Sequence, residues 1–216
     1  MSRMLDSRAN ILLACALSAL AGYVDGIGFL HLGGLFVSFM SGNSTRMGVS
    51  LADGQWSGAL EAFSLIVLFV VGAAAGSLIV LGRAAHRQAL LLLTEALLLV
   101  AAALAYHLGL QATAVAAIVL AMGLENAVFQ IDGGGGLGLT YVTGALVKVG
   151  QLLASAITGG PRWGWLPNLL LCAALVAGAV AGALAYKNFN LGAIWIAAGM
   201  ALALAAMIAA TAKRSD

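Results

Sequence analysis

The sequence predicts an all-α polytopic membrane protein. Hydrophobic residues make up 62% of its 216 positions and charged residues only 8%, and the mean hydropathy is +1.05. Several apolar stretches reach the length of about 20 residues that a helix needs to cross a bilayer. A chain of this composition leaves no room for a soluble domain. We therefore expect one membrane domain over residues 1–216, in contact with the lipid bilayer.

Six apolar stretches are the strong candidates for membrane-spanning helices. They cover residues 11–30, 59–81, 89–106, 112–131, 166–186 and 191–210. The first has no small-residue cleavage site at its end, which indicates a retained helix rather than a signal peptide. Two further segments, 35–52 and 137–157, mix apolar residues with glycine, polar and charged residues. We expect broken or re-entrant helices there, with eight spans as the alternative.

An internal repeat relates the two halves of the chain. One shift along the sequence, with a single inserted residue, aligns the following pairs: Gly33-Gly34 with Gly134-Gly135, Ser41-Gly42 with Thr143-Gly144, Arg46 with Lys148, and Asp25 with Asn126. Repeat one then covers residues 11–108 and repeat two covers 112–211. With three crossings in each half, the repeats are inverted relative to each other, as in many transporters.

Basic residues predict the orientation, because Lys and Arg are enriched in cytoplasmic loops. If both ambiguous segments return to the side they left, the cytoplasmic set is Arg3, Arg8, Arg83, Arg87, Arg162, Lys213 and Arg214. Only Lys187 then lies on an outer loop. Both termini are expected in the cytoplasm, and the eight-span alternative fits this distribution less well.

Five charged residues lie within apolar surroundings: Asp25, Arg46, Glu95, Glu125 and Lys148. Each costs about 2.5 to 3.5 kcal/mol at the centre of a bilayer, or about 15 kcal/mol together, so none of them is expected to face lipid. Asp25 near Lys148 and Arg46 near Glu125 are candidate pairs. Asp25, Glu125, Asn126 and Glu95 are candidates for proton binding or charge balance, with a structural ion pair as the alternative. Glu95 has Ala197 as its repeat equivalent and so lacks this symmetry.

The polar run inside residues 35–52 predicts a solute site. Gly42 lets the backbone leave the helix, and Asn43, Ser44 and Thr45 are residue types that cap a restarted helix. A helix N-terminus favours anions, and Arg46 adds a fixed positive charge. The predicted solute-binding set is Ser41, Gly42, Asn43, Ser44, Thr45 and Arg46, with Thr143 and Lys148 from the second half. The alternative is that these residues lock helices together by close packing and hydrogen bonds.

Aromatic residues provide a further set of candidates for shaping a cavity, with helix packing as the alternative. They are Tyr23, Phe29, Phe39, Phe129 and Tyr141.

Two stretches, Gly22-Tyr23-Val24-Asp25 and Ser41-Gly42-Asn43-Ser44-Thr45, carry a resemblance that extends over nearly the whole chain. In these segments the sequence resembles the YoaK family of bacterial inner-membrane proteins, a domain of unknown function. The resemblance implies a location in the bacterial inner membrane and about six spans. It implies no substrate.

The function expected from these residues is that of a small secondary transporter or permease, working by alternating access around a midplane site. The solute is expected to be small and polar, with anions among the candidates. A channel is the nearest alternative, and a structural or sensory subunit without transport is another. No nucleophile and base, cofactor motif or metal cluster occurs at suitable spacing, so we expect no enzyme, cofactor or metal. The net charge of +2 does not suggest a nucleic-acid partner. The sequence is compatible with a homo-oligomer.

The predicted topology can be tested at the loop between the second and third spans. A cysteine introduced as Ala85→Cys should resist impermeant thiol reagents added to intact cells, because this loop is expected in the cytoplasm. Ready labelling of that cysteine would contradict the six-span arrangement with cytoplasmic termini.

Overall fold

The computed structural model describes residues 8–82, 87–128 and 142–212, and every regular element in these ranges is a helix. The elements are α1 (Arg8–His31), α2 (Met40–Ala52), α3 (Trp56–Leu81), α4 (Arg87–His107), α5 (Gln111–Glu125), α6 (Val142–Ile157), α7 (Leu166–Phe189), the short 3-10 helix η2 (Asn190–Ala193) and α8 (Ile194–Ala212). The all-α expectation is thus met over the described residues. Arg3, Arg83, Phe129, Gly134-Gly135, Tyr141, Lys213 and Arg214 lie outside the described ranges.

Within the described ranges, four apolar helical stretches are long enough to cross a membrane. They are Asn10–His31, Trp56–Leu81, Arg87–His107 and Leu166–Thr211, the last of which contains both α7 and α8. The chain is therefore a helical membrane protein. α3 is covered on one side by exposed apolar side chains such as Phe63, Val67 and Val70, as expected for a face in contact with lipid.

The fourth predicted stretch, 112–131, ends earlier than expected. α5 stops at Glu125, and residues 126–128 form a turn in which Ala127 and Val128 donate backbone hydrogen bonds to Leu124 and Glu125. The polar segment 35–52 contains α2, with 13 residues, and the polar segment 137–157 contains α6, with 16 residues. Hydropathy did not detect the end of α5 because Ala127 and Val128 are apolar and buried.

Helices α1 and α7 run parallel and touch backbone to backbone through glycine. A Cβ atom built on Gly22 would lie 2.1 Å from the Leu175 carbonyl oxygen, and one built on Gly182 would lie 2.0 Å from the Tyr23 carbonyl oxygen. Glycines on both helices therefore remove the side chains that would hold the two backbones apart. This is the most extensive helix pair in the described part of the chain.

Helices α3 and α5 form a second pair of the same kind. A Cβ on Gly72 would lie 2.2 Å from the Leu120 carbonyl oxygen, and one on Gly123 would lie 2.2 Å from that of Phe69. One turn further along both helices, a Cβ on Gly76 would lie 2.8 Å from the Leu124 carbonyl oxygen, so α3 and α5 are also parallel. The remaining long helices, α4 and α8, pack against each other, and Trp195 at the start of α8 donates a hydrogen bond to His107 at the end of α4.

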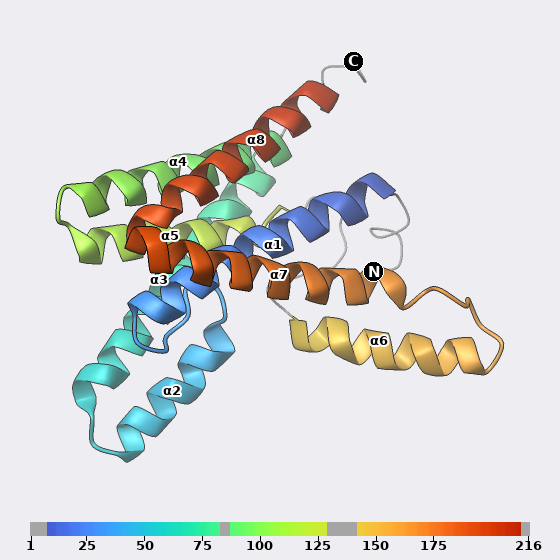
Figure 1. The fold of residues 1–216 in the computed structure, drawn as a ribbon, viewed down its shortest axis with the longest axis horizontal. Helices are drawn as coiled ribbons and strands as arrows, with labels where there is room; N and C mark the ends of the chain where they lie inside the picture. Colours follow the sequence, from blue (N-terminus) through green and yellow to red (C-terminus); the bar gives the residue numbers. More distant parts are fainter. Residues whose placement is uncertain (1–7, 83–86, 129–141, 213–216) are drawn as a thin grey trace.

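The two short helices lie at opposite ends of the bundle. Figure 1 shows α2 beside the start of α3 at the lower left, and α6 beside the start of α7 at the lower right. α6 has no buried residue, whereas α2 buries Asn43 and Ser50. The main apolar core lies between α1, α3, α4, α5 and α8, and Met47 of α2 packs against its edge.

The close contact between α1 and α7 leads to a stability prediction. Gly182→Ala should lower the thermal unfolding temperature in detergent, because the added methyl group must displace the backbone of α1, and such overpacking costs about 1–3 kcal/mol. Gly199→Ala is the matched control, since nothing lies within 4 Å of its Cβ position. An unchanged Gly182→Ala variant would contradict the tight α1–α7 contact.

Candidate functional site

The connection between α1 and α2 is a helix break inside the bundle. Gly33 and Gly34 adopt positive φ angles of 60° and 102°, which turn the chain back toward α1. Residues 35–39 then run without regular structure until α2 begins at Met40. Leu35, Val37 and Ser38 are buried, so the backbone polar groups of this segment need partners inside the protein.

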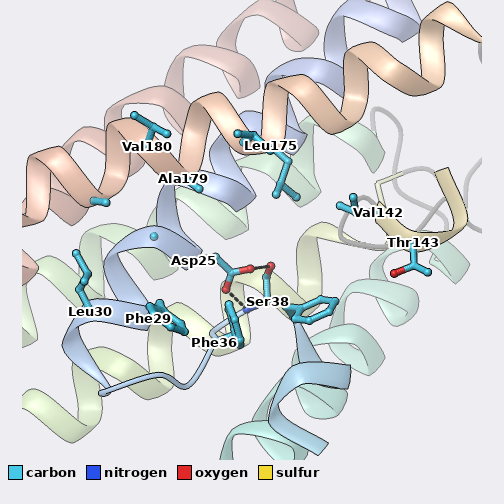
Figure 2. Close-up of a pocket in the computed structure, with 14 residues that line it drawn as sticks. Asp25, Phe29, Leu30, Phe36, Ser38, Val142, Thr143, Leu175, Ala179 and Val180 are labelled. Carbon is cyan, nitrogen blue, oxygen red and sulfur yellow. Dashed lines mark hydrogen bonds between the residues drawn. The ribbon is translucent and has the colours of Figure 1, made fainter. Parts of the chain in front are cut away.

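The Asp25 carboxylate on α1 is the hydrogen-bond partner of two of these backbone groups. Its Oδ1 accepts hydrogen bonds from the backbone N–H groups of Val37, at 2.9 Å, and Ser38, at 2.7 Å. Its Oδ2 accepts a hydrogen bond from the Ser38 hydroxyl, which Figure 2 shows pointing at the carboxylate. A buried carboxylate thus binds the segment just before the N-terminus of α2, where negative charge is favourable.

Asn43 on α2 holds the same segment from the other side. Its Oδ1 accepts a hydrogen bond from the Phe36 N–H at 2.8 Å, and its Nδ2 donates to the Phe36 carbonyl at 2.7 Å. Asn43 is fully buried, and its Nδ2 also contacts the Met40 sulfur at 3.6 Å. These two hydrogen bonds to Phe36 agree with the alternative interpretation of the polar run, in which its residues hold the structure together by packing and hydrogen bonds.

The expected capping role of the polar run is wrong. α2 begins at Met40, with Phe39 at the N-cap and no side-chain capping hydrogen bond. Ser44 and Thr45 lie inside the helix, and their hydroxyls donate to the carbonyls of Met40 and Ser41 one turn earlier. The helix breaks earlier than expected because the positive φ angles occur at Gly33 and Gly34, while Gly42 is helical. The lack of a side chain at Gly42 leaves room for the Phe36 and Phe39 rings.

The basic residues of the two polar segments do not join the acidic ones. Arg46 is exposed on α2 and Lys148 is half-buried on α6. In the described ranges, no ion pair connects Asp25 with Lys148, and Glu125 has no hydrogen-bond partner that Arg46 would supply. The two expected cross-repeat pairs are therefore absent there, since Asp25 is already bound by the backbone before α2.

A pocket of about 660 Å³ lies beside this helix break. Its wall consists of the end of α1, the segment before α2, the first residues of α6 and one face of α7; the lining residues include Asp25, Phe29, Phe36, Ser38, Phe39, Val142, Thr143, Ala179 and Ala183. In Figure 2, Asp25 and Ser38 lie on one side, the α7 residues Leu175, Ala179 and Val180 on another, and Thr143 on α6. The pocket brings together the starts of both short helices.

The pocket includes only a few of the predicted site residues. Thr143 lines it from the predicted solute-binding set and Asp25 from the predicted charge-coupling set, whereas the residues from Ser41 to Arg46 and Lys148 do not. Phe29 and Phe39 line it, as their aromatic character suggested. Tyr23 instead donates a hydrogen bond to the Ala193 carbonyl inside the core.

Sequence reasoning missed two parts of the wall. Ser38 was not singled out because an isolated serine beside an apolar run has no distinctive pattern. The α7 face was missed because Ala179 and Ala183 carry no chemistry of their own, although their four-residue spacing places them on one side of a helix.

Two further carboxylates lie deep in the bundle. Glu95 on α4 and Glu125 at the end of α5 are both 0% exposed, so the expectation that they do not face lipid is confirmed. No group in the described part of the chain donates a hydrogen bond to any of their four carboxyl oxygens. Asn126 is half-buried and donates to the Met122 carbonyl within its own turn, at 2.9 Å.

The family model described as a protein of unknown function, DUF1275, matches residues 13–207 of this chain. The chain belongs to the DUF1275 family. A UPF0700 transmembrane protein of Rhizobium meliloti (strain 1021) is 36% identical over 200 residues, which cover 93% of this chain and 86% of the relative. No solved structure matches the chain. Membership of the DUF1275 family is consistent with the resemblance to the YoaK proteins, and the relative's description agrees with a membrane location.

The role of Asn43 can be tested without any ligand. Asn43→Ala should lower the free energy of unfolding by about 1–3 kcal/mol, because it removes both hydrogen bonds to the backbone of the half-buried Phe36. Thr45→Ala, which removes an exposed hydroxyl on the same helix, should have little effect. Both can be compared by thermal unfolding in detergent. Equal stability of the two variants would show that the hydrogen bonds to Phe36 do not support the fold.

Proposed function

We propose that this DUF1275 protein is a small secondary transporter or permease, which moves a small solute by alternating access. The observation that carries the proposal is the pocket between α1, α7 and the starts of α2 and α6. Interrupted helices that meet near the middle of a membrane form the solute sites of many transporters. A purely structural role explains the hydrogen bonds of Asp25 and Asn43 but gives no reason for a cavity of this size beside them.

The proposal includes six crossings, by α1, α3, α4, α5, α7 and α8, with α2 and α6 as re-entrant helices. His31, at the end of α1, lines a second cavity together with Glu61 near the start of α3 and Gln111 at the start of α5. The end of α1 therefore lies near the starts of α3 and α5, as alternating up and down helices require. α2 begins beside Asp25, within the bundle, and ends close to the start of α3, which supports a segment that enters and returns on one side.

The helix contacts also support two inverted repeats, 11–108 and 112–211. Exchanging the halves replaces α1 by α5 and α7 by α3, and it therefore converts the α1–α7 pair into the α5–α3 pair. Both pairs are parallel and both pack glycine against backbone carbonyl groups. Likewise, α2 packs on α3 as α6 packs on α7. Such a relation provides the two equivalent arrangements that alternating access needs.

The lining of the pocket bears on the solute. The expectation of an anion rested on Arg46 and Lys148, and neither lines the pocket. Its wall is mostly apolar, with polar atoms from Asp25, Ser38 and Thr143. We therefore propose a solute with an apolar body and a small polar group, bound between the aromatic residues of the helix break and the small residues of α7.

The proposed setting is the bacterial inner membrane with both termini in the cytoplasm. α1 begins at Arg8 and α8 ends at Ala212, and Figure 1 shows these two helix ends at the same end of the long axis. This placement supports termini on one side, and the excess of Lys and Arg in the loops supports the cytoplasmic assignment. The proposal includes no catalytic chemistry, cofactor or nucleic-acid partner.

The pocket can be tested by filling it. Ala183→Phe should abolish the thermal stabilisation produced by compounds found in a ligand screen of the purified protein, and should abolish their flux into liposomes, because a phenyl ring occupies the site. Ala181→Phe is the matched control, since Ala181 is exposed on the same helix and does not line the pocket. Wild-type binding and flux by a folded Ala183→Phe variant would place the site elsewhere.

A further inference from the structure

The two buried glutamates occupy matching depths in the hairpin formed by α4 and α5. Glu95 lies 12 residues before the end of α4 (107 − 95), and Glu125 lies 14 residues after the start of α5 (125 − 111). At 1.5 Å per residue, both are about 18–21 Å from the connection between the helices. Their carboxyl groups interact electrostatically with each other, and Glu125 also interacts with Asp25.

The surroundings of this pair contain no positive charge in the described ranges. α8, which packs on α4, has no titratable residue, and the one on α3 is Glu61, which is exposed. On α4 itself, the Arg87 guanidinium donates to the Val80 carbonyl, and His107 is exposed at the far end of the helix. α1 begins at Arg8, 17 residues before Asp25 (25 − 8), and its other titratable groups are Cys15, Tyr23, Asp25 and His31, of which Asp25 is the one whose charge acts on Glu125.

The pair differs from Asp25 in its hydrogen bonding. Asp25 receives three hydrogen bonds from Val37 and Ser38, which suit an ionised carboxylate. Glu95 and Glu125 receive none from the described residues, although both are fully buried. Glu125 is also the last residue of α5, where the helix dipole disfavours a negative charge. Two buried carboxylates that repel each other and have no hydrogen-bond donors cannot both stay ionised without a cation.

We propose that Glu95 and Glu125 form a single proton-binding site in the interior of the bundle, and that Asp25 is a structural carboxylate that links this site electrostatically to the pocket. A proton is the cation that fits, because it needs one carboxyl oxygen as its covalent partner and a second as hydrogen-bond acceptor. A metal ion prefers more oxygen ligands, and no group of three or more His, Cys, Asp or Glu residues gathers in the described part of the chain.

This inference rests on the proposed function only where the proton serves as the coupling ion for transport. In that role, protonation changes the charge of the pair, and Asp25, which lines the pocket, feels the change. Solute bound beside Asp25 and the proton on the pair would then influence each other's affinity reciprocally.

The test follows the proton directly. Protein reconstituted in liposomes is studied by pH-difference infrared spectroscopy of the carboxylic-acid C=O stretch, with an isotope label on the glutamate carboxyl carbons. The sequence contains three glutamates, Glu61, Glu95 and Glu125, so a label-sensitive band in the E61Q variant must come from the buried pair. We expect this band at neutral pH, its loss in alkaline buffer, full amplitude in E61Q and complete loss in the E95Q/E125Q double variant.

Two results would overturn the proposal. One is the lack of a glutamate acid band at neutral pH in the folded E61Q variant, as expected if both buried carboxylates are ionised around a metal cation. The other is a band of full amplitude in a folded E95Q/E125Q variant. If the double variant does not fold, the labelled wild-type and E61Q proteins still decide the question. No solute is needed, so the outcome is independent of whether the protein transports.

Discussion

A bilayer offers no hydrogen bonds to exposed backbone, and the helix break between α1 and α2 exists only because side chains supply them. Asp25 binds the N–H groups of Val37 and Ser38, and Asn43 binds both backbone polar groups of Phe36. Without these partners, residues 35–39 would leave several buried polar groups unsatisfied, at a cost of about 1–3 kcal/mol each. The position of α2, and with it one wall of the pocket, depends on this small network.

Close helix contact is the second requirement for the pocket. Glycines bring α1 and α7 together so tightly that each backbone touches the other, which fixes the small-residue face of α7 opposite the helix break. Because lipid is as apolar as the side chains, apolar burial does little to drive helices together inside a membrane. Shape complementarity of this kind therefore accounts for much of the association. The pocket lies beside this contact, and Ala179 and Ala183, each next to one of the α7 glycines Gly178 and Gly182, line it.

The three buried carboxylates of the described residues have different environments, and their chemistry follows from the difference. Asp25 is surrounded by donors and can remain charged while it holds the backbone in place. Glu95 and Glu125 lie at matching depths of the α4–α5 hairpin without hydrogen-bond donors from the described residues. Residues of one chemical class thus divide between a structural and a titrating role, and the division is set by hydrogen bonds rather than by burial, which all three share.

The sequence by itself determined that the chain is a helical membrane protein, located its long apolar helices, and required Asp25, Glu95 and Glu125 to face the interior. These conclusions hold because hydropathy and the cost of a charge in lipid are properties of short segments. Only the tertiary structure decided that the helix break comes at Gly33 and Gly34 rather than at Gly42, that Arg46 and Lys148 do not pair with the acidic residues, and that the pocket is mostly apolar. Hydrogen-bond partners and cavity walls come from segments far apart in the chain, and their positions depend on which glycine meets which backbone.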